Sequence, residues 1–432
     1  MTAVAGGTNF RKWSILALLS LGMVIAYIDR ANLSVVLAAP EFRSTFDLSD
    51  SARGLLNSAF FWSYAVLQIP AGWLVDRYGV RRVYAIGFFF WTLVSAMTGF
   101  ANSMYQLITL RLLLGAGESV GAPASLRWIR WNCPEQERGF AIGIYMAGTK
   151  IGAAIGVPIA VFLITSLNWR AMFFVCGLSG FLWLITWLML VRETPAGAVA
   201  SRAENLETEI PFRDIIMTRT VVGILLGTFS YGYFLYFCVT WLPAYLVENR
   251  HLALAAMGFY SLFSFAGMAV MAILSGWLAD WMISRGTDPA RTRKVFTILG
   301  FVLASTEVFG AWTNSQTIAL FFAAFSLAGL GLATANYWAL TQTLIPGKAM
   351  GRIAGIQNCA SNLGGVAAPI LTGWLKEKSG GYQAPMQAIW IILLIGMASY
   401  LFLVRSTALG KARGHASKSD SPARASSSSQ HL

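Results

Sequence analysis

Six ionisable side chains lie inside long apolar stretches of this sequence. An ionised group at the centre of a membrane helix costs about 2.5–3.5 kcal/mol on an insertion scale, so such groups usually face one another or a water-filled path. Carboxylates in this setting can carry protons, and guanidinium or ammonium groups can bind anions. The acids are Asp29, Glu118 and Glu307, and the bases are Arg30, Arg111 and Lys150.

Arg111 and Glu118 share one helix face in the stretch RLLLGAGE. Seven residues turn a helix by about 700°, within roughly 20° of two full turns. Their backbones are then about 10 Å apart along the axis, so contact needs extended side chains or a bridging water. We interpret Glu118 as a proton site whose proton affinity Arg111 controls. The alternative is a buried pair that only fixes helix packing, although such pairs are weak stabilisers.

The first apolar stretch contains YIDR, which brings Tyr27, Asp29 and Arg30 together. Adjacent residues diverge by about 100° on a helix, so Asp29 and Arg30 point in different directions. One of them can line a central cavity while the other meets a neighbouring helix. Tyr64 and Gln68 lie one turn apart in the second stretch and are interpreted as cavity residues.

None of the three histidines lies in an apolar stretch, so a proton carrier inside the membrane must be a carboxylate. The four cysteines have no paired spacing, which indicates neither a disulfide framework nor a zinc site. The apolar stretches also contain no nucleophile–histidine pair. We therefore expect a protein that is not an enzyme and needs no metal or cofactor, with protons as the coupling ion.

The elements that position these residues are membrane helices. The chain has 432 residues, of which 56% are hydrophobic and 12% charged, whereas about a quarter of the residues of a soluble domain are charged. A helix needs about 20 apolar residues to cross the hydrocarbon core. The sequence predicts an all-α membrane protein with twelve transmembrane helices, at residues 13–39, 53–75, 82–100, 104–127, 138–165, 170–191, 220–247, 255–283, 294–312, 315–344, 350–374 and 384–404.

Basic residues predict the orientation of these helices. Most Lys and Arg residues outside the spans fall on the side of the N-terminus, so both termini are expected to face the cytoplasm. The expected location is a bacterial inner membrane, which the chain crosses many times. The same asymmetry accounts for the net charge of +13 without a nucleic acid partner. The first apolar run is too long for a signal-peptide core, and we expect it to be a retained helix. The expected surroundings are membrane lipid, and the expected state is a monomer.

The chain divides into two similar halves. GWLVD, which ends at Asp76, recurs as GWLAD, which ends at Asp280. Parallel six-helix repeats place a substrate site between the halves near the membrane midplane. The predicted parts are a cytoplasmic N-terminus at 1–12, six-helix bundles at 13–191 and 220–404, a cytoplasmic linker at 192–219 and a disordered cytoplasmic tail at 405–432.

The stretch GWLVDRYGVRR resembles the loop between helices two and three of the major facilitator superfamily, G-x-x-x-D-R-x-G-x-R-R. Every fixed position of that pattern is matched. The resemblance implies the major facilitator fold and a role in conformational gating for Asp76, Arg77 and Arg81. The second copy is degraded after Asp280, to which we assign the corresponding gating role.

A closer resemblance comes from YIDR, SYAVLQIPAGW, RLLLGAGE and ERG, which are similar to stretches of the anion:cation symporter family, especially its bacterial transporters for galactonate, glucarate and hexuronates. By this resemblance, Asp29 and Glu118 carry protons and Arg30 holds the substrate carboxylate. Arg111 is coupled to the glutamate. The resemblance also implies that Tyr27, Tyr64, Trp338 and Asn358 line the substrate site, with Asn362 a turn beyond Asn358.

Lys150 departs from the family pattern. Sugar-acid transporters usually have a neutral polar group at this point of the fifth helix, and either Thr149 or Lys150 is its equivalent. Lys150 lies too deep in its span to reach the interface easily. It is either a second anion ligand, which would favour a dicarboxylate, or a neutralising partner of an internal acid. For Glu307, in the outer half of the ninth helix, we expect a structural or interfacial role.

The sequence thus predicts a secondary transporter that imports an organic anion, of the sugar-acid class, together with protons by alternating access. Protonation of Glu118 and Asp29 would make the site more positive, so protons and anion would bind together. An exchanger or exporter of the same fold and a sodium-coupled symporter remain alternatives. A channel, a sensor or a membrane enzyme lacks support from any motif.

Overall fold

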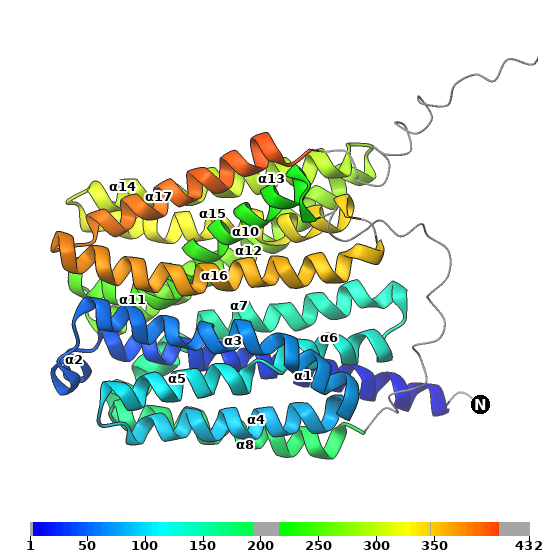
Figure 1. The fold of residues 1–432 in the computed structure, drawn as a ribbon, viewed down its shortest axis with the longest axis horizontal. Coiled ribbons are helices and arrows are strands. Elements are labelled where there is room, and N and C mark those ends of the chain that lie inside the picture. Colours follow the sequence, from blue (N-terminus) through cyan, green and yellow to red (C-terminus); the bar gives the residue numbers. More distant parts are fainter. Residues whose placement is uncertain (1–2, 193–215, 346, 406–432) are drawn as a thin grey trace, which may run out of the picture.

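The computed structural model describes residues 3–192, 216–345 and 347–405, and throughout these ranges the regular structure is helical (Figure 1). Long helices run side by side along the longest axis of the molecule. The predicted linker at 192–219 and the tail at 405–432 lie almost entirely outside the described residues.

The first half of the chain forms six membrane-length segments with two short elements between them. Several of its helices begin at a Ser or Asn whose side chain accepts a backbone N–H of the first turn, as Ser49, Ser103 and Asn168 do. The helices are α1 (Ala3–Ala38), α2 (Pro40–Phe46), α3 (Asp50–Tyr78), α4 (Val80–Met97), η1 (Thr98–Phe100), α5 (Met104–Glu118), α6 (Gly121–Asn132), α7 (Glu135–Ser166) and α8 (Trp169–Leu190).

The second half forms six further segments, and Asp288 and Ser315 provide the same kind of cap. Its helices are α10 (Arg219–Thr240), α11 (Leu242–Ala244), η2 (Tyr245–Asn249), α12 (Leu254–Ser284), α13 (Pro289–Ala304), α14 (Glu307–Trp312), α15 (Gln316–Leu344), α16 (Gly347–Ser379), α17 (Gln383–Ala398) and η3 (Ser399–Leu403).

Three predicted spans are interrupted. The fourth breaks between α5 and α6, directly after Glu118, and the ninth breaks between α13 and α14, directly before Glu307. In the seventh, α10 ends at Thr240, and Pro243 lies at the start of the next helix, α11. The break occurs here because a proline lacks the N–H that would continue the hydrogen bonds of α10. Two of the six membrane charges therefore lie at helix breaks.

Nine helical segments of the described chain are long and apolar enough to cross a membrane. The three remaining segments, α3, α5 with α6, and α16, run parallel to the others (Figure 1). Gln68 on α3 and Asn358 on α16 lower the hydropathy of their helices, and α5 is only 15 residues long. The prediction of an all-α protein with twelve spans in two bundles is confirmed. The least apolar spans include α3 and α16, which meet each other between the bundles.

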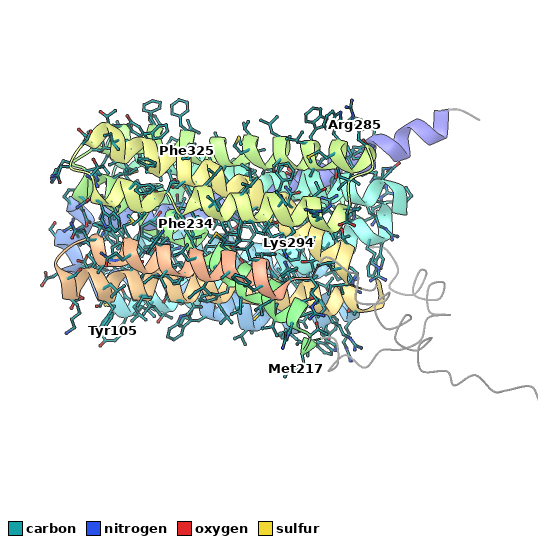
Figure 2. All side chains as sticks on the ribbon, turned by 90° about the horizontal axis from the view of Figure 1, so that it is seen from above. Tyr105, Met217, Phe234, Arg285, Lys294 and Phe325 are labelled. Atoms are coloured by element: carbon teal, nitrogen blue, oxygen red, sulfur yellow. The ribbon has the colours of Figure 1, made fainter. Side chains whose placement is uncertain are left out.

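The outside of the bundles is covered by apolar side chains (Figure 2). Tyr105, Met217 and Phe325 are exposed, whereas Phe234 is fully buried. Exposed aromatic and aliphatic side chains on this scale suit contact with lipid rather than water. The observed surface agrees with a multi-pass membrane protein.

The two bundles touch most closely where α3 meets α16. A Cβ atom added to Gly54 would lie 2.4 Å from the carbonyl oxygen of Pro369, and one added to Gly373 would lie 2.3 Å from that of Asp50. Both distances are far below van der Waals contact, so only glycine permits this approach of the two backbones. The contact lies at the end of the molecule away from the N-terminus (Figure 1).

Candidate functional site

A buried ion pair joins Arg30 of α1 to Glu118, the last residue of α5. The Nη2 and Nε atoms of Arg30 lie 2.9 Å and 3.0 Å from the same carboxylate oxygen, Oε2. Both side chains are almost fully shielded from solvent. The other oxygen, Oε1, has no hydrogen-bond partner within the described part of the chain. A proton can therefore be added at Oε1 without displacing Arg30.

Three aromatic rings surround the guanidinium of Arg30. Its Cζ atom lies 4.7 Å from the ring centroid of Tyr27, 4.7 Å from that of Phe60 and 4.6 Å from that of Tyr64. Cation–π attraction is strongest where water is excluded. The rings hold the guanidinium in position, and Tyr27 and Tyr64 lie beside it.

Asp29 points the other way, toward α4. The indole Nε1 of Trp91 donates to Oδ2 at 2.6 Å, and the hydroxyl of Ser95 donates to Oδ1 at 2.8 Å. Trp91 and Ser95 are four residues apart and so share one face of α4. Sequence reasoning missed both. An indole N–H and a hydroxyl at this spacing in an apolar helix were the available signal.

The expected partnership of Arg111 and Glu118 is not a direct contact. Both side chains are buried, but Arg111 donates to the backbone carbonyl of Asp29 at 3.5 Å, whereas Glu118 pairs with Arg30. The separation of about 10 Å along α5 explains why the two side chains do not touch each other. Helix α1 therefore connects the two charges.

Polar contacts link the bundles beside these charges. Asn358 of α16 donates to the side-chain oxygen of Gln68 on α3 at 2.8 Å. Asn362 donates to the carbonyl of Asn358 at 3.0 Å and accepts from the hydroxyl of Tyr236 at 3.4 Å. The ring of Tyr236 packs edge-on against Phe61 of α3, with centroids 4.4 Å apart. Tyr236 belongs to an aromatic run in α10, and no sequence signal distinguished it from its neighbours.

Lys150 is half-buried on α7, and no hydrogen bond or ion pair joins it to any other described residue. Eleven residues turn a helix by about 1100°, so Lys150 lies within roughly 20° of Val161 on the helix surface. Val161 faces Gly258 of α12. Lys150 therefore lies on the stripe of α7 that faces the second bundle. Its neighbour Thr149 is buried and donates to the carbonyl of Met146 in its own helix.

Two further residues stand apart from the Arg30 pair. Trp338 is half-buried against the ring of Tyr337. Glu307 is buried between α14 and α15, where Ser326 donates to its Oε2 at 2.6 Å and Oε1 has no partner among the described residues. Neither contacts Arg30, Glu118 or Asp29 in the hydrogen bonds, ion pairs and ring contacts of the described chain.

The predicted gating residues brace helices within their own bundle. Asp76 of α3 forms an ion pair with Arg127 of α6, and Arg81 of α4 donates to the carbonyl of Leu188 in α8 at 2.8 Å. In the second half, Asp280 of α12 pairs with Arg293 of α13 at 2.8 Å. Arg77 lies over the rings of Trp73 and Tyr78. The two ion pairs and the Arg81 hydrogen bond connect neighbouring helices near the end of the molecule that carries the N-terminus, whereas Arg77 contacts rings of its own helix.

Twelve membrane segments in two bundles, with buried charges near the boundary between them, define a membrane transporter with two parallel repeats. The sequence model of the Major Facilitator Superfamily matches residues 19–369, and the chain belongs to this superfamily.

Relatives narrow the class further. Over 416 residues, the chain is 30% identical to the D-galactonate transporter of Escherichia coli O6:H1. The aligned region covers 91% of this chain and 96% of that protein. The chain is also 28% identical to the probable galactarate/D-glucarate transporter GudP of Escherichia coli K12, and this alignment covers 93% of the chain and 95% of GudP. A solved inward-facing, unoccupied bacterial homolog of the human lysosomal transporter Spinster has a TM-score of 0.77 at 19% identity, covering 92% and 97%.

The two similarities carry different information. The solved structure supports the fold alone, because its sequence identity is low. The sequence relatives confirm the resemblance to sugar-acid transporters, and they are transporters rather than enzymes. The chain is thus a major facilitator related to sugar-acid transporters.

Proposed function

We propose that this protein imports an organic anion of the sugar-acid class together with protons, by alternating access of two bundles at 13–191 and 220–404. The observation that carries the proposal is the buried Arg30–Glu118 pair with one free carboxylate oxygen. While Glu118 is ionised, it neutralises Arg30. A proton on Glu118 cancels that attraction and leaves the guanidinium available for a substrate carboxylate.

Coupling follows from this exchange of partners. The anion binds better when Glu118 is protonated, and by linkage the proton binds better when the anion is present. Asp29 is proposed as the second proton carrier, with Arg111 fixed on the backbone of the same turn. Tyr27, Tyr64, Gln68, Asn358 and Asn362 would then contact the hydroxyl groups of the substrate.

Lys150 is proposed as a second anion ligand. Its placement on the α7 stripe that faces α12, without an acidic partner among the described residues, supports this role over charge balance within the protein. Thr149 and Trp338 are proposed to border the same substrate. Asp76, Arg77, Arg81 and Asp280 would keep each bundle rigid while the bundles rock. With both termini in the cytoplasm, the contact between α3 and α16 would close the outer side.

The test is uptake of radiolabelled D-galactonate into proteoliposomes with an imposed pH gradient. Glu118→Gln should abolish accumulation against the concentration gradient while leaving some exchange. Glu307→Gln removes a buried carboxyl that does not contact Arg30, and it should preserve accumulation. Undiminished uphill uptake by Glu118→Gln would refute the assignment of the proton site.

Two controls separate the remaining alternatives. Replacement of sodium by choline should leave uptake unchanged if protons are the coupling ion. Counterflow without a pH gradient measures exchange on its own, and a protein that performs only counterflow is an exchanger.

A further inference from the structure

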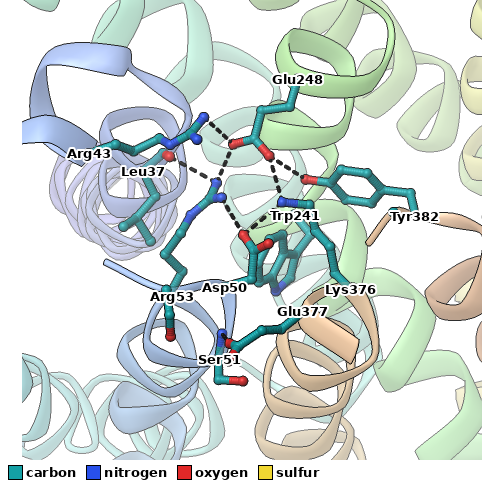
Figure 3. Close-up of polar contacts among 12 residues, drawn as sticks. Leu37, Arg43, Asp50, Ser51, Arg53, Trp241, Glu248, Lys376, Glu377 and Tyr382 are labelled. Atoms are coloured by element: carbon teal, nitrogen blue, oxygen red, sulfur yellow. Dashed lines mark hydrogen bonds and ion pairs between the residues drawn. The ribbon is translucent and has the colours of Figure 1, made fainter. Parts of the chain in front are cut away.

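Five charged side chains gather at the end of the molecule away from the N-terminus, which is the outer end in the proposed orientation (Figures 1 and 3). Oε1 of Glu248 lies 2.9 Å from Arg43 and 2.7 Å from Arg53, and Oε2 lies 2.9 Å from Lys376. Asp50 accepts from Arg53 at 2.8 Å and from Lys376 at 2.7 Å. We name Arg43, Asp50, Arg53, Glu248 and Lys376 the outer charge cluster.

The outer charge cluster is divided between the bundles. Arg43, Asp50 and Arg53 belong to α2 and α3, whereas Glu248 and Lys376 belong to η2 and α16. Opening of the outer side must therefore pull Glu248 away from both arginines. Glu248 keeps Lys376 and Arg53 keeps Asp50, but Arg43 loses its ion-pair partner. The first bundle is then left with two positive charges against one negative charge.

Arg53 is held in place by groups that stay with it. Its Nη2 donates to the carbonyl of Leu37 on α1 at 2.9 Å, and its Nη1 donates to Asp50 in its own helix. Both partners belong to the first bundle. Arg53 thus stays oriented toward the vacated position after Glu248 leaves, so a new ligand would meet a preorganised donor.

The donor set is suited to a carboxylate because it already holds one. Three cations form ion pairs with the two oxygens of Glu248, and the hydroxyl of Tyr382 donates to Oε2 at 3.2 Å. Burial opposes ionisation of Glu248, but Arg53 and Lys376 beside it hold its pKa below the usual value. Charge-assisted hydrogen bonds of this kind are the strongest that proteins make to a carboxylate.

A surface hollow of about 390 Å³ opens at the cluster, and its wall includes Arg43, Asp50 and Lys376. This volume falls in the range of small-molecule sites. An anion from the outer solution can therefore approach Arg43 before the bundles separate. Arg53 is buried in this closed arrangement and becomes accessible only as the outer ends separate. The hollow is an observation independent of the ion pairs.

We propose that Arg43 and Arg53 form a capture site for the carboxylate of an incoming organic anion, which replaces Glu248 as the outer ends of the bundles separate. One carboxylate is exchanged for another at the arginines, so opening leaves no cation without a partner. External anion therefore favours opening. The role rests on the proposed function, because it needs an anionic substrate.

The experiment measures the distance between the outer ends by pulsed electron resonance on the purified, full-length protein in nanodiscs. Spin labels are attached at Thr45→Cys and Gln383→Cys, both exposed, in a Cys359→Ser background, since the other three cysteines are buried. The probe is D-galactonate, with sodium chloride at equal ionic strength as the control. The measured quantity is the anion concentration that half-saturates the separated state.

Glu248→Gln removes the charged competitor, so the half-saturating concentration should fall about tenfold. Glu377→Gln is the matched control, because Glu377 also crosses the bundles, where it accepts from the backbone N–H of Ser51, but forms no ion pair with any described residue. It should loosen the contact and lower that concentration much less than Glu248→Gln does, because Glu377 lines the hollow but forms no ion pair with the arginines. Arg43→Gln should remove most of the anion effect. In an Arg30→Ala background, which lacks the proposed central carboxylate ligand, the effect should persist.

An unchanged half-saturating concentration in Glu248→Gln, or an anion effect that survives Arg43→Gln, would overturn the capture site. Loss of the effect in the Arg30→Ala background would assign it to the central site instead. Failure of the proposed function appears separately, as absence of sugar-acid uptake by the unmodified protein in proteoliposomes.

Discussion

A single methyl group at Gly373 should prevent full closure of the outer side. The new Cβ would lie 2.3 Å from the carbonyl oxygen of Asp50 and 3.2 Å from the Cα of Gly54. These neighbours are backbone atoms and cannot rotate away, so α3 and α16 must move apart by about 1 Å to restore ordinary contact. The hydrogen bond from Lys376 to Asp50, now 2.7 Å, would then exceed the distance limit for such bonds.

The expected size of this effect follows from overpacking. Forcing an extra methyl into a close-packed contact costs about 1–3 kcal/mol, which corresponds to a shift of about 5- to 150-fold in the ratio of closed to separated outer ends. Gly373→Ala should therefore populate the separated state and slow uptake, because the cycle must pass through the closed form. Each bundle keeps its own core, so the protein should still fold.

The assay combines spin-label distances between the outer ends with uptake into proteoliposomes. Gly355→Ala is the matched control, since it adds the same methyl to the same helix at a position with no atom within 4 Å. It should change neither the distances nor the rate. A closed distance distribution in Gly373→Ala, with an unchanged rate, would refute the argument that this glycine permits closure.

Three further predictions address individual charges. Lys150→Gln should raise the KM for D-glucarate about tenfold and that for D-galactonate much less, as measured by uptake; equal changes would contradict a second carboxylate ligand. Trp91→Phe removes the indole N–H that donates to Asp29; a hydrogen bond to a charged acceptor contributes about 1.5–3 kcal/mol. The uptake rate should fall at least tenfold. An unaffected rate would show that this hydrogen bond has no part in coupling. Because the pKa of Glu248 lies below its usual 4.5, its ion pairs stabilise the closed outer ends above that pH. This contribution should disappear as the external pH falls through the lowered pKa, as read from spin-label distances; the same acid response in Glu248→Gln would point to another group.

Much of the architecture followed from the sequence. Runs of apolar residues predicted the twelve spans, because an α-helix satisfies its backbone groups internally in lipid. The same reasoning identified Asp29, Arg30, Arg111 and Glu118, since a charge in an apolar span is costly unless it has a partner or a water-filled path. The GWLVDRYGVRR motif indicated the superfamily, and the comparison with its sequence model confirmed it.

The pairing of these charges was decided by tertiary structure. Periodicity placed Arg111 and Glu118 on one face of a helix, but it contains no information on which neighbouring helix meets each of them. The tertiary arrangement of the helices brought the side chain of Glu118 on α5 to Arg30 on α1. It also brought Trp91 and Ser95 of α4 to Asp29.

The outer charge cluster is the clearest example of an arrangement that the sequence could not predict. Charged residues at the ends of membrane helices are ordinary, so Arg53 and Glu248 drew no attention in the sequence. They are far apart along the chain, and only the close approach of α3 and α16 at Gly54 and Gly373 lets the two bundles bring them together. The sequence by itself determined which segments enter the membrane and which charges they carry. The tertiary structure decided the partner of each charge, because partners come from different helices whose mutual packing no local pattern encodes.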